Sequence, residues 1–90
     1  MIKNKRIFVV GGAGSIGSEL VRQLAIHNKI YILDINESGL FDVIDSLKSY
    51  WVHGRVGDIR DYKTVADVFD DFKPQIVINS AAYKHVHLME

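Results

Sequence analysis

Short apolar runs alternate with amphipathic segments along this chain. The runs Ile7–Val10, Ile30–Leu33 and Gln75–Asn79 are rich in β-branched residues, which is typical of strands buried on both faces. One more run, within residues 51–58 and third in chain order, predicts a weaker strand because Gly54 and Gly57 interrupt it. We therefore expect four short strands.

The segments between these strands have helical periodicity, with apolar residues recurring three or four positions apart. Asp61 is expected to cap the third helix and Lys73–Pro74 to end it. A further helix is expected to begin within residues 80–90. The predicted apolar faces of the first three helices are Ile16, Leu20, Val21 and Leu24; then Leu40, Phe41, Val43, Ile44 and Leu47; then Tyr62, Val65, Ala66, Phe69 and Phe72.

This alternation of strands and helices predicts an α/β fold. Right-handed crossovers would give a Rossmann-like three-layer sandwich, with a parallel sheet of about four strands in the order 3-2-1-4. That is an incomplete doubly wound fold. We expect residues 1–90 to form a truncated, N-terminal dinucleotide-binding half-domain without a linker or second domain.

Composition and charge exclude several classes of function. Eleven Lys and Arg balance eleven Asp and Glu, so no overall charge attracts nucleic acid or an anionic membrane. No stretch approaches the ~20 apolar residues of a membrane span. Cysteine is absent, which excludes thiolate metal sites and fits a cytoplasmic protein. His85 and His87 have no accompanying carboxylate pattern, so no metal site is predicted.

A glycine cluster separates the first predicted strand from the first helix. Gly11, Gly14 and Gly17 form G-x-x-G-x-x-G, and Gly12, Gly14 and Gly17 also satisfy G-x-G-x-x-G. Glycine at these positions permits a tight turn, close approach of the backbone to a pyrophosphate, and close packing of helix on strand. The helix N-terminus then presents N–H groups to the anion. The alternative is a glycine-rich turn that binds no ligand.

Acidic residues end the second and third predicted strands. Asp34 follows the glycines by about 20 residues, where a carboxylate accepts hydrogen bonds from ribose hydroxyls. Because a carboxylate there repels a 2′-phosphate, the sequence favours NAD over NADP. The alternative is that Asp34 caps the following turn. Asp58 is expected either to accept from the adenine amino group, with Ile59 beside it, or to cap the next helix.

With these residues in place, the chain resembles the extended short-chain dehydrogenase/reductase superfamily. The segments "VVGGAGSIGSEL", "GDIRD" and "INSAAYKHVHLME" are most similar to its polysaccharide-biosynthesis branch, the CapD-like UDP-N-acetylglucosamine 4,6-dehydratases. Ala81–Val86, "AAYKHV", is the most specific part. Asn79–Ser80 and His87 depart from the branch, which often has His–Ala and proline there. The resemblance covers all 90 residues but only the N-terminal part of such an enzyme.

The resemblance implies a lyase acting on a nucleotide sugar such as a UDP-sugar. NAD or NADP takes hydride from C4, water is lost across C5 and C6, and hydride returns at C6. By position, it implies cofactor contacts from these residues: Gly11, Gly14, Ser15, Ile16 and Gly17 at the pyrophosphate; Asp34 and Asn36 at the ribose; Asp58 and Ile59 at the adenine; Ser80, Ala81 and Ala82 along the cofactor; and Lys84 at the cofactor or substrate edge.

The superfamily's catalytic Tyr-x-x-x-Lys pair is absent, since no tyrosine of the chain is followed four positions later by lysine. We therefore expect no catalytic residue here, weak cofactor binding by the 90 residues alone, and a longer parent enzyme. An alternative of another class is a non-catalytic NAD-sensing module that regulates a partner, against which "AAYKHV" argues. A third is a fragment that binds nothing and pairs with a second copy through the exposed edge of its fourth strand.

Overall fold

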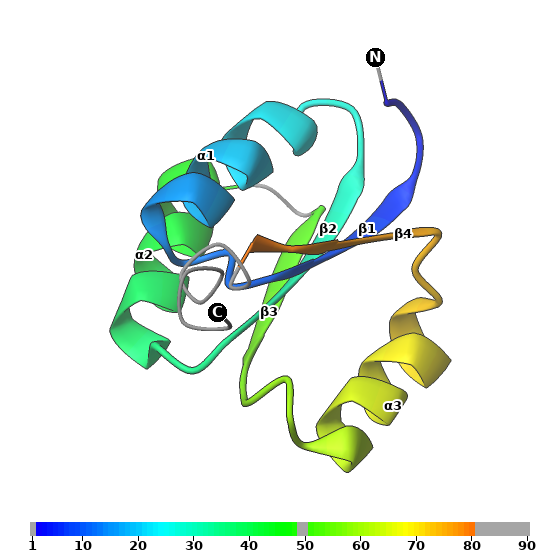
Figure 1. The fold of residues 1–90 in the computed structure, drawn as a ribbon. Helices are drawn as coiled ribbons and strands as arrows, with labels where there is room; N and C mark the ends of the chain where they lie inside the picture. Colours follow the sequence, from blue (N-terminus) through cyan, green and yellow to red (C-terminus); the bar gives the residue numbers. More distant parts are fainter. Residues whose placement is uncertain (1, 49–50, 81–90) are drawn as a thin grey trace, which may run out of the picture.

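The computed structural model describes residues 2–48 and 51–80. Strands and helices alternate in the order β1 (Arg6–Val10), α1 (Ser15–Leu24), β2 (Lys29–Asp34), α2 (Glu37–Leu47), β3 (Val52–Val56), α3 (Tyr62–Phe72) and β4 (Ile76–Asn79). The four strands are parallel and lie in the order β3-β2-β1-β4 (Figure 1). The predicted Rossmann-like α/β fold and its strand order are confirmed.

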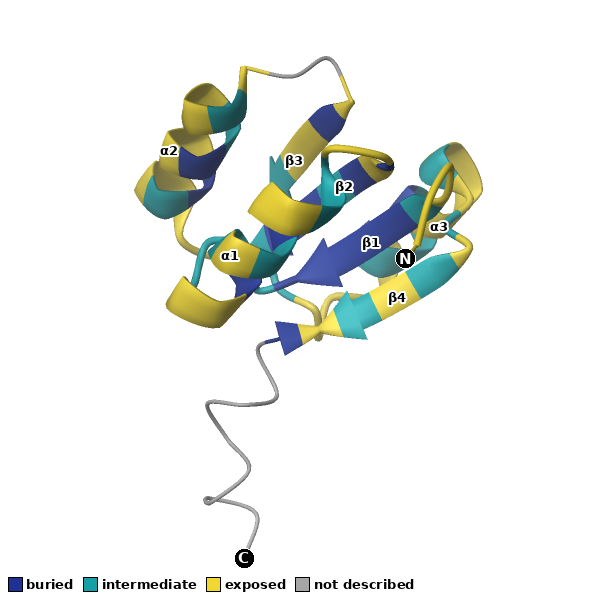
Figure 2. Cartoon of the chain, turned by 90° about the horizontal axis from the view of Figure 1, so that it is seen from above, coloured by how far each residue is buried: buried dark blue, intermediate teal, exposed yellow. Residues whose placement is uncertain are grey.

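Two helices cover one face of the sheet and one covers the other. Figure 1 shows α1 and α2 on one side and α3 opposite. Since side chains alternate along a strand, Ile7 and Val9 of β1 pack in the core with α1 and α2, while Phe8 and Val10 pack in the core with α3. These four residues are buried, and β1 is the dark central strand of Figure 2. The layered arrangement follows from this double burial.

Gly54 interrupts β3 for a packing reason. A Cβ added there would lie 2.7 Å from Cδ1 of Ile44 and 2.8 Å from Cδ1 of Leu40. Both side chains come from α2, and Leu40 is fully buried. The glycine that weakens the strand pattern in the sequence therefore allows α2 to lie directly on β3.

Of the aromatic or aliphatic positions predicted to face the core, three are at least half exposed, and Phe69 is 43% exposed. Tyr62 is 85% exposed, Phe41 52% and Ile16 50%. Tyr62 and Ile16 lie in first helical turns, where a side chain points back toward the helix N-terminus and past the sheet. Phe41 lies about 100° around α2 from the buried Leu40, on the side away from the sheet. The α3 face is centred instead on the buried Thr64 and Val68.

The predicted helix boundaries hold for α3. Asp61 is its N-cap, and Oδ1 of Asp61 accepts from the N–H groups of Lys63 and Thr64 at 3.1 and 3.5 Å. The helix ends at Lys73, which adopts the left-handed conformation with φ 53° before Pro74. Lys48 ends α2 in the same way, with φ 47°.

β4 is less buried than its sequence predicts. Within the described residues it pairs with β1 alone, and its residues alternate between intermediate and exposed (Figure 2). Val77 is 49% exposed although its register partner Phe8 is fully buried. The difference arises because α3 packs over Phe8 and Leu33, toward the centre of the sheet. None of the helices in residues 2–48 and 51–80 has the length and apolar content to span a membrane.

Candidate functional site

The described site residues follow the carboxyl ends of the parallel strands, which meet at one edge of the sheet. Val10 of β1 is in register with Leu33 of β2 and with Asn79 of β4, and Asp34 is in register with Val56 of β3. The residues immediately after these positions are therefore neighbours. In open parallel sheets, ligands bind at this edge.

The turn after β1 is held against β2 through its backbone. Gly11 has φ 79°, the left-handed region that favours glycine. Its N–H donates to the carbonyl of Leu33 at 2.8 Å, and its own carbonyl accepts from the N–H of Gly14 at 3.2 Å. The conformation of the turn is therefore held by hydrogen bonds within the chain itself.

Gly17 and Gly12 are required by packing. A Cβ at Gly17 would lie 2.2 Å from the carbonyl oxygen of Gly11 and 2.9 Å from Cα of Gly12, both backbone atoms. This agrees with the prediction that a side chain at Gly17 would push the helix away from the strand. A Cβ at Gly12 would lie 2.4 Å from Cγ2 of Ile32. Gly12 thus contributes to the turn, although it was not among the predicted cofactor contacts.

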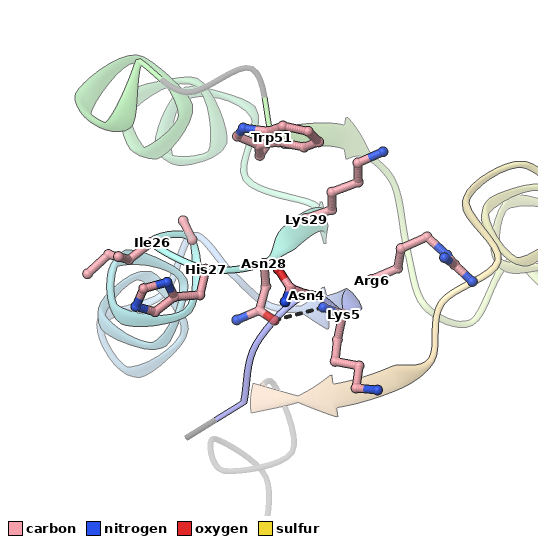
Figure 3. Close-up of a pocket in the computed structure, with 9 residues that line it drawn as sticks. Asn4, Lys5, Arg6, Ile26, His27, Asn28, Lys29 and Trp51 are labelled. Atoms are coloured by element: carbon pink, nitrogen blue, oxygen red, sulfur yellow. Dashed lines mark hydrogen bonds between the residues drawn. The ribbon is translucent and has the colours of Figure 1, made fainter.

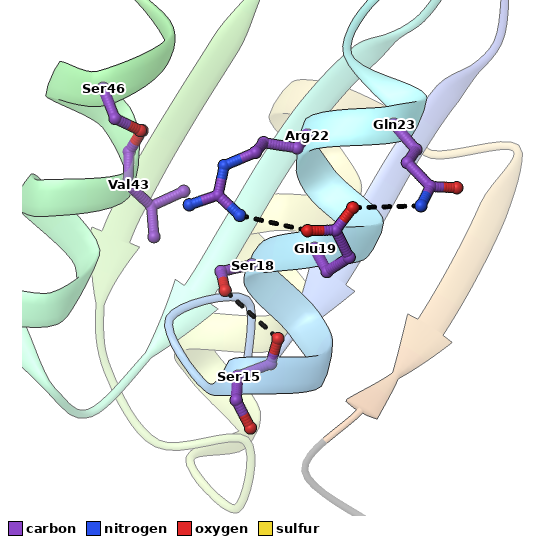
Figure 4. Close-up of polar contacts among 7 residues, drawn as sticks. All are labelled: Ser15, Ser18, Glu19, Arg22, Gln23, Val43 and Ser46. Atoms are coloured by element: carbon purple, nitrogen blue, oxygen red, sulfur yellow. Dashed lines mark hydrogen bonds and ion pairs between the residues drawn. The ribbon is translucent and has the colours of Figure 1, made fainter.

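The start of α1 has backbone N–H groups and no side-chain cap. Gly14 is its N-cap and contributes no side chain, and the first turn has no acidic residue. Ser15 and Ile16 are exposed. The nearest carboxylate along the helix, Glu19, is engaged by Arg22 at 3.2 Å and Gln23 at 3.0 Å (Figure 4). The first turn of α1 therefore supplies no negative charge to balance the positive end of the helix dipole.

Asp34 joins the end of β2 to the glycine turn. Its Oδ2 accepts from the N–H of Ala13 at 2.9 Å, and its Oδ1 accepts from the N–H of Asn36 at 2.9 Å. The second bond caps the turn that follows β2, which was the alternative predicted role of Asp34. The first reaches across 21 residues. Each carboxylate oxygen retains a further acceptor position, so these bonds are compatible with ribose hydroxyls.

The start of α2 lies against the same turn. Asn36 is the N-cap of α2, and its Oδ1 accepts from the N–H of Gly39 at 3.1 Å and from the Ser38 hydroxyl at 3.2 Å. A Cβ at Gly39 would lie 3.3 Å from Cβ of Ala13. Ala13 and Gly39 were not predicted as site residues. The only sign of them in the sequence is that both are small and lie close in the sequence to predicted site residues.

Asp58 pairs with Arg60 in this structure. Its Oδ2 lies 2.7 Å from Nη2 of Arg60, and its Oδ1 accepts from the Arg60 N–H at 2.9 Å. The side-chain hydrogen bonds from Arg60 lower the pKa of Asp58 to about 2, and the same pair raises the pKa of Arg60. The alternative prediction, that Asp58 caps α3, is wrong because Asp61 is the cap. Ile59 is 39% exposed beside it.

The side chain of Ser80 contacts the end of β1 and the start of the glycine turn. The residue is 4% exposed, and its hydroxyl oxygen lies 2.8 Å from the carbonyl oxygen of Val10 and 3.0 Å from that of Gly11. The side chain is therefore directed at β1 and not toward an open surface. Ala81, Ala82 and Lys84, the remaining predicted contacts, lie outside the described residues. Residues 2–48 and 51–80 contain no cluster of three or more His, Asp or Glu that could hold a metal ion.

Comparison with known proteins gives a family and several relatives. The polysaccharide biosynthesis protein family model matches residues 7–90. An uncharacterized membrane protein of Methanocaldococcus jannaschii is 40% identical over 90 residues, which cover 98% of this chain and 26% of that protein. The capsular polysaccharide biosynthesis protein CapD of Staphylococcus aureus is 35% identical, with 99% of this chain and 16% of the relative covered. A dTDP-glucose 4,6-dehydratase of Haemophilus influenzae is 32% identical, with 89% and 25% covered.

A solved structure supports the same relationship. The UDP-N-acetylglucosamine 4-epimerase of Methanobrevibacter ruminantium, in complex with UDP-N-acetylmuramic acid, superposes with a TM-score of 0.70 at 27% identity. The match covers 87% of this chain and 24% of the epimerase. This chain thus spans about a quarter or less of the length of these relatives. The matched family model covers nearly the whole sequence, so the chain belongs to the polysaccharide biosynthesis protein family.

Proposed function

We propose that this chain is the dinucleotide-binding part of a nucleotide-sugar 4,6-dehydratase or epimerase, with NAD as the preferred cofactor. The observation that carries the proposal is the hydrogen bond between Oδ2 of Asp34 and the N–H of Ala13. It holds a carboxylate beside the glycine turn at the carboxyl edge of the sheet, where a dinucleotide places its ribose and pyrophosphate.

The residues present fit such a cofactor. Gly17, where a Cβ would meet backbone atoms, allows α1 to pack closely against the turn. The start of α1, which has no side-chain cap, favours an anion. In this proposal, the cofactor supplies hydride transfer when it is bound. The pyrophosphate would lie against Gly11, Gly14, Ser15, Ile16 and Gly17, the ribose against Asp34 and Asn36, the adenine against Asp58 and Ile59, and the remaining cofactor against Ser80, Ala81, Ala82 and Lys84.

The Asp34 carboxylate supports NAD over NADP. Its negative charge would lie next to the 2′ position of the ribose and would repel a 2′-phosphate. The substrate class, a sugar linked to a nucleoside diphosphate, is proposed from the similarity to a dTDP-glucose 4,6-dehydratase and a UDP-N-acetylglucosamine 4-epimerase. This similarity does not favour a regulatory NAD-sensing module. We assign the activity to the cytoplasm, in keeping with the absence of cysteine.

Calorimetric titration of the 90-residue chain with NAD and with NADP tests the cofactor. We expect saturable binding that is weak and tighter for NAD. In Asp34→Asn, the loss of the charge should weaken NAD binding about tenfold and narrow the difference between the two cofactors. Asp45→Asn, an exposed aspartate on α2, is the matched control and should leave both affinities unchanged. Equal affinity for NAD and NADP in the unmodified chain would contradict the proposed preference.

The catalytic step is proposed to require residues that these 90 do not contain. No Tyr-x-x-x-Lys pair is present in the sequence. Incubation of the chain with NAD and a UDP-sugar should therefore produce no keto sugar. Keto-sugar formation at a rate above the cofactor-only control would overturn this part of the proposal.

A further inference from the structure

A basic hollow lies at the amino ends of the strands, on the edge of the sheet opposite the glycine turn. Its volume is about 460 Å³, and it is open to solvent on one side. The residues that matter for its chemistry come from the start of β1, the α1–β2 connection and the residue before β3 (Figure 3): Lys5, Arg6, His27, Asn28, Lys29 and Trp51.

The lining carries positive charge without a carboxylate. Lys5, Arg6 and Lys29 line the hollow, and no Asp or Glu of residues 2–48 and 51–80 does. The ion pairs found in residues 2–48 and 51–80 use Arg22, Arg55 and Arg60, so none of them neutralises this group. Although the whole chain is formally neutral, this edge therefore has a local positive potential.

The framework of the hollow is fixed by hydrogen bonds. Asn28 is 5% exposed, and its side-chain amide donates to the carbonyls of Ile2 and Leu24 at 3.1 and 2.9 Å. Its Oδ1 accepts from the N–H of Lys5 at 3.0 Å. The N–H of Lys29 donates to the carbonyl of Lys5 at 2.9 Å. The backbone beneath the cationic side chains thus needs no reordering to bind a ligand, which lowers the entropic cost of binding.

Trp51 positions one of the cations. The Lys29 ammonium lies 4.9 Å from the centroid of the Trp51 ring, within the range of a cation–π contact (Figure 3). The ammonium covers a ring face on which an aromatic ligand would otherwise stack. Recognition at this hollow is therefore by charge. Arg6 uses its Nε to donate to the carbonyl of Lys73 at 2.8 Å, and its guanidinium has further donors.

We propose that this hollow binds a phosphate group, at a site separate from that of the dinucleotide. A phosphate carries more than one negative charge and several acceptor oxygens, which matches a hollow of this size with two lysines and an arginine in its lining. The phosphate belongs either to a soluble phosphate compound or to a phospholipid headgroup. The chemistry is shared, and the two arms of the test separate the sources.

Trp51 is the only tryptophan of the chain, so its fluorescence reports occupancy of the hollow directly. In the first arm, pyrophosphate is titrated while sodium chloride keeps the ionic strength constant. We expect a saturable change, with affinity about fivefold weaker in Lys5→Gln and in Lys29→Gln. Because Lys29 contacts Trp51, its replacement also changes the starting signal, and Lys5→Gln is the cleaner variant.

Lys63→Gln is the matched control, because Lys63 is exposed at the start of α3, near the carboxyl edge of the sheet. It should bind like the unmodified chain. In the second arm, the proteins are sedimented with vesicles of phosphatidylglycerol or of phosphatidylcholine. Lysine-dependent binding to phosphatidylglycerol without a pyrophosphate response would assign the phosphate to a lipid headgroup. No response in either arm from chain shown to be folded by circular dichroism, or equal losses in Lys63→Gln, would overturn the proposal.

Discussion

A methyl group on Gly17 would lie 2.7 Å from the hydroxyl oxygen of Ser80, so the first turn of α1 is in direct contact with the residue that follows β4. These two residues are 63 positions apart in the sequence, and they connect the first and last described elements of the site. Ser80 therefore stabilises the turn on the side that faces β1. The backbone N–H groups at the start of α1 have no side-chain cap.

Gly17→Ala should lower the free energy of unfolding by about 3 kcal/mol or more. The clash with the Gly11 carbonyl at 2.2 Å involves backbone, which cannot move without displacing the turn. Adding Ser80→Ala should not restore stability, because that clash remains. Gly39→Ala is the control. The atom nearest to its added methyl group is the side-chain nitrogen of Asn36. The free energy of unfolding, measured by urea denaturation, should change by less than about 1 kcal/mol.

Ser80→Ala alone should destabilise the chain by about 1 kcal/mol, since the buried Val10 carbonyl and the part-buried Gly11 carbonyl lose a donor. Ser46 is exposed on α2, and Ser46→Ala removes a similar 2.8 Å hydrogen bond to the Val43 carbonyl; it should cost about 0.5 kcal/mol or less. Chemical denaturation of both variants measures the difference. Equal losses would show that the Ser80 hydroxyl has no special part in supporting the turn.

Lys73→Gly and Lys48→Gly should each stabilise the chain by about 0.5–1 kcal/mol. Both lysines end their helices in the left-handed conformation, with φ 53° and 47°, where a Cβ is unfavourable and glycine is not. Lys63→Gly places glycine in the first turn of α3 with no such strain to relieve and should destabilise it. Thermal unfolding at fixed pH compares the three, and a fall in Tm for Lys73→Gly would contradict the explanation.

The Asp58–Arg60 pair should make a small contribution to stability that depends on acid pH. The pKa of Asp58 is about 2 in the folded chain and 3.8 ordinarily, so the folded state favours the carboxylate. The contribution is present above about pH 4 and is lost as the pH falls from 4 to 2. A carboxyl NMR titration should find the pKa of Asp58 raised toward its ordinary value in Arg60→Gln. Because both side chains are exposed, solvent screens the pair.

The sequence predicts the strands and their order well because burial on both faces produces continuous apolar runs, as in Ile7–Val10. It is less reliable where a residue lies in the first turn of a helix. Tyr62 and Ile16 have the correct spacing for the core but point past the end of the sheet. Periodicity records which side of a helix a residue occupies, and it does not record where the sheet ends.

The site is only partly predictable for a different reason. Local signals identify the glycine turn and Asp34, since strand, turn and helix are adjacent in the chain. The contacts that define their geometry are not local. The bond from Ala13 to Asp34 spans 21 residues, and the Ser80 hydroxyl reaches Val10 across 70. The pairing of Asp58 with Arg60 is local. The sequence "GDIRD" alone does not show whether the Asp58 carboxylate pairs with Arg60 or with another group.

The bond between Ala13 and Asp34 links two properties that protein engineers usually treat as independent. The carboxylate proposed to discriminate between cofactors is also an acceptor for the backbone of the turn. A replacement that admits a 2′-phosphate but has no acceptor oxygen, such as Asp34→Arg, leaves the Ala13 N–H without that partner. Cofactor preference in this chain is therefore expected to be epistatic, because such a replacement becomes tolerable only together with a second substitution that supplies a new acceptor to the turn.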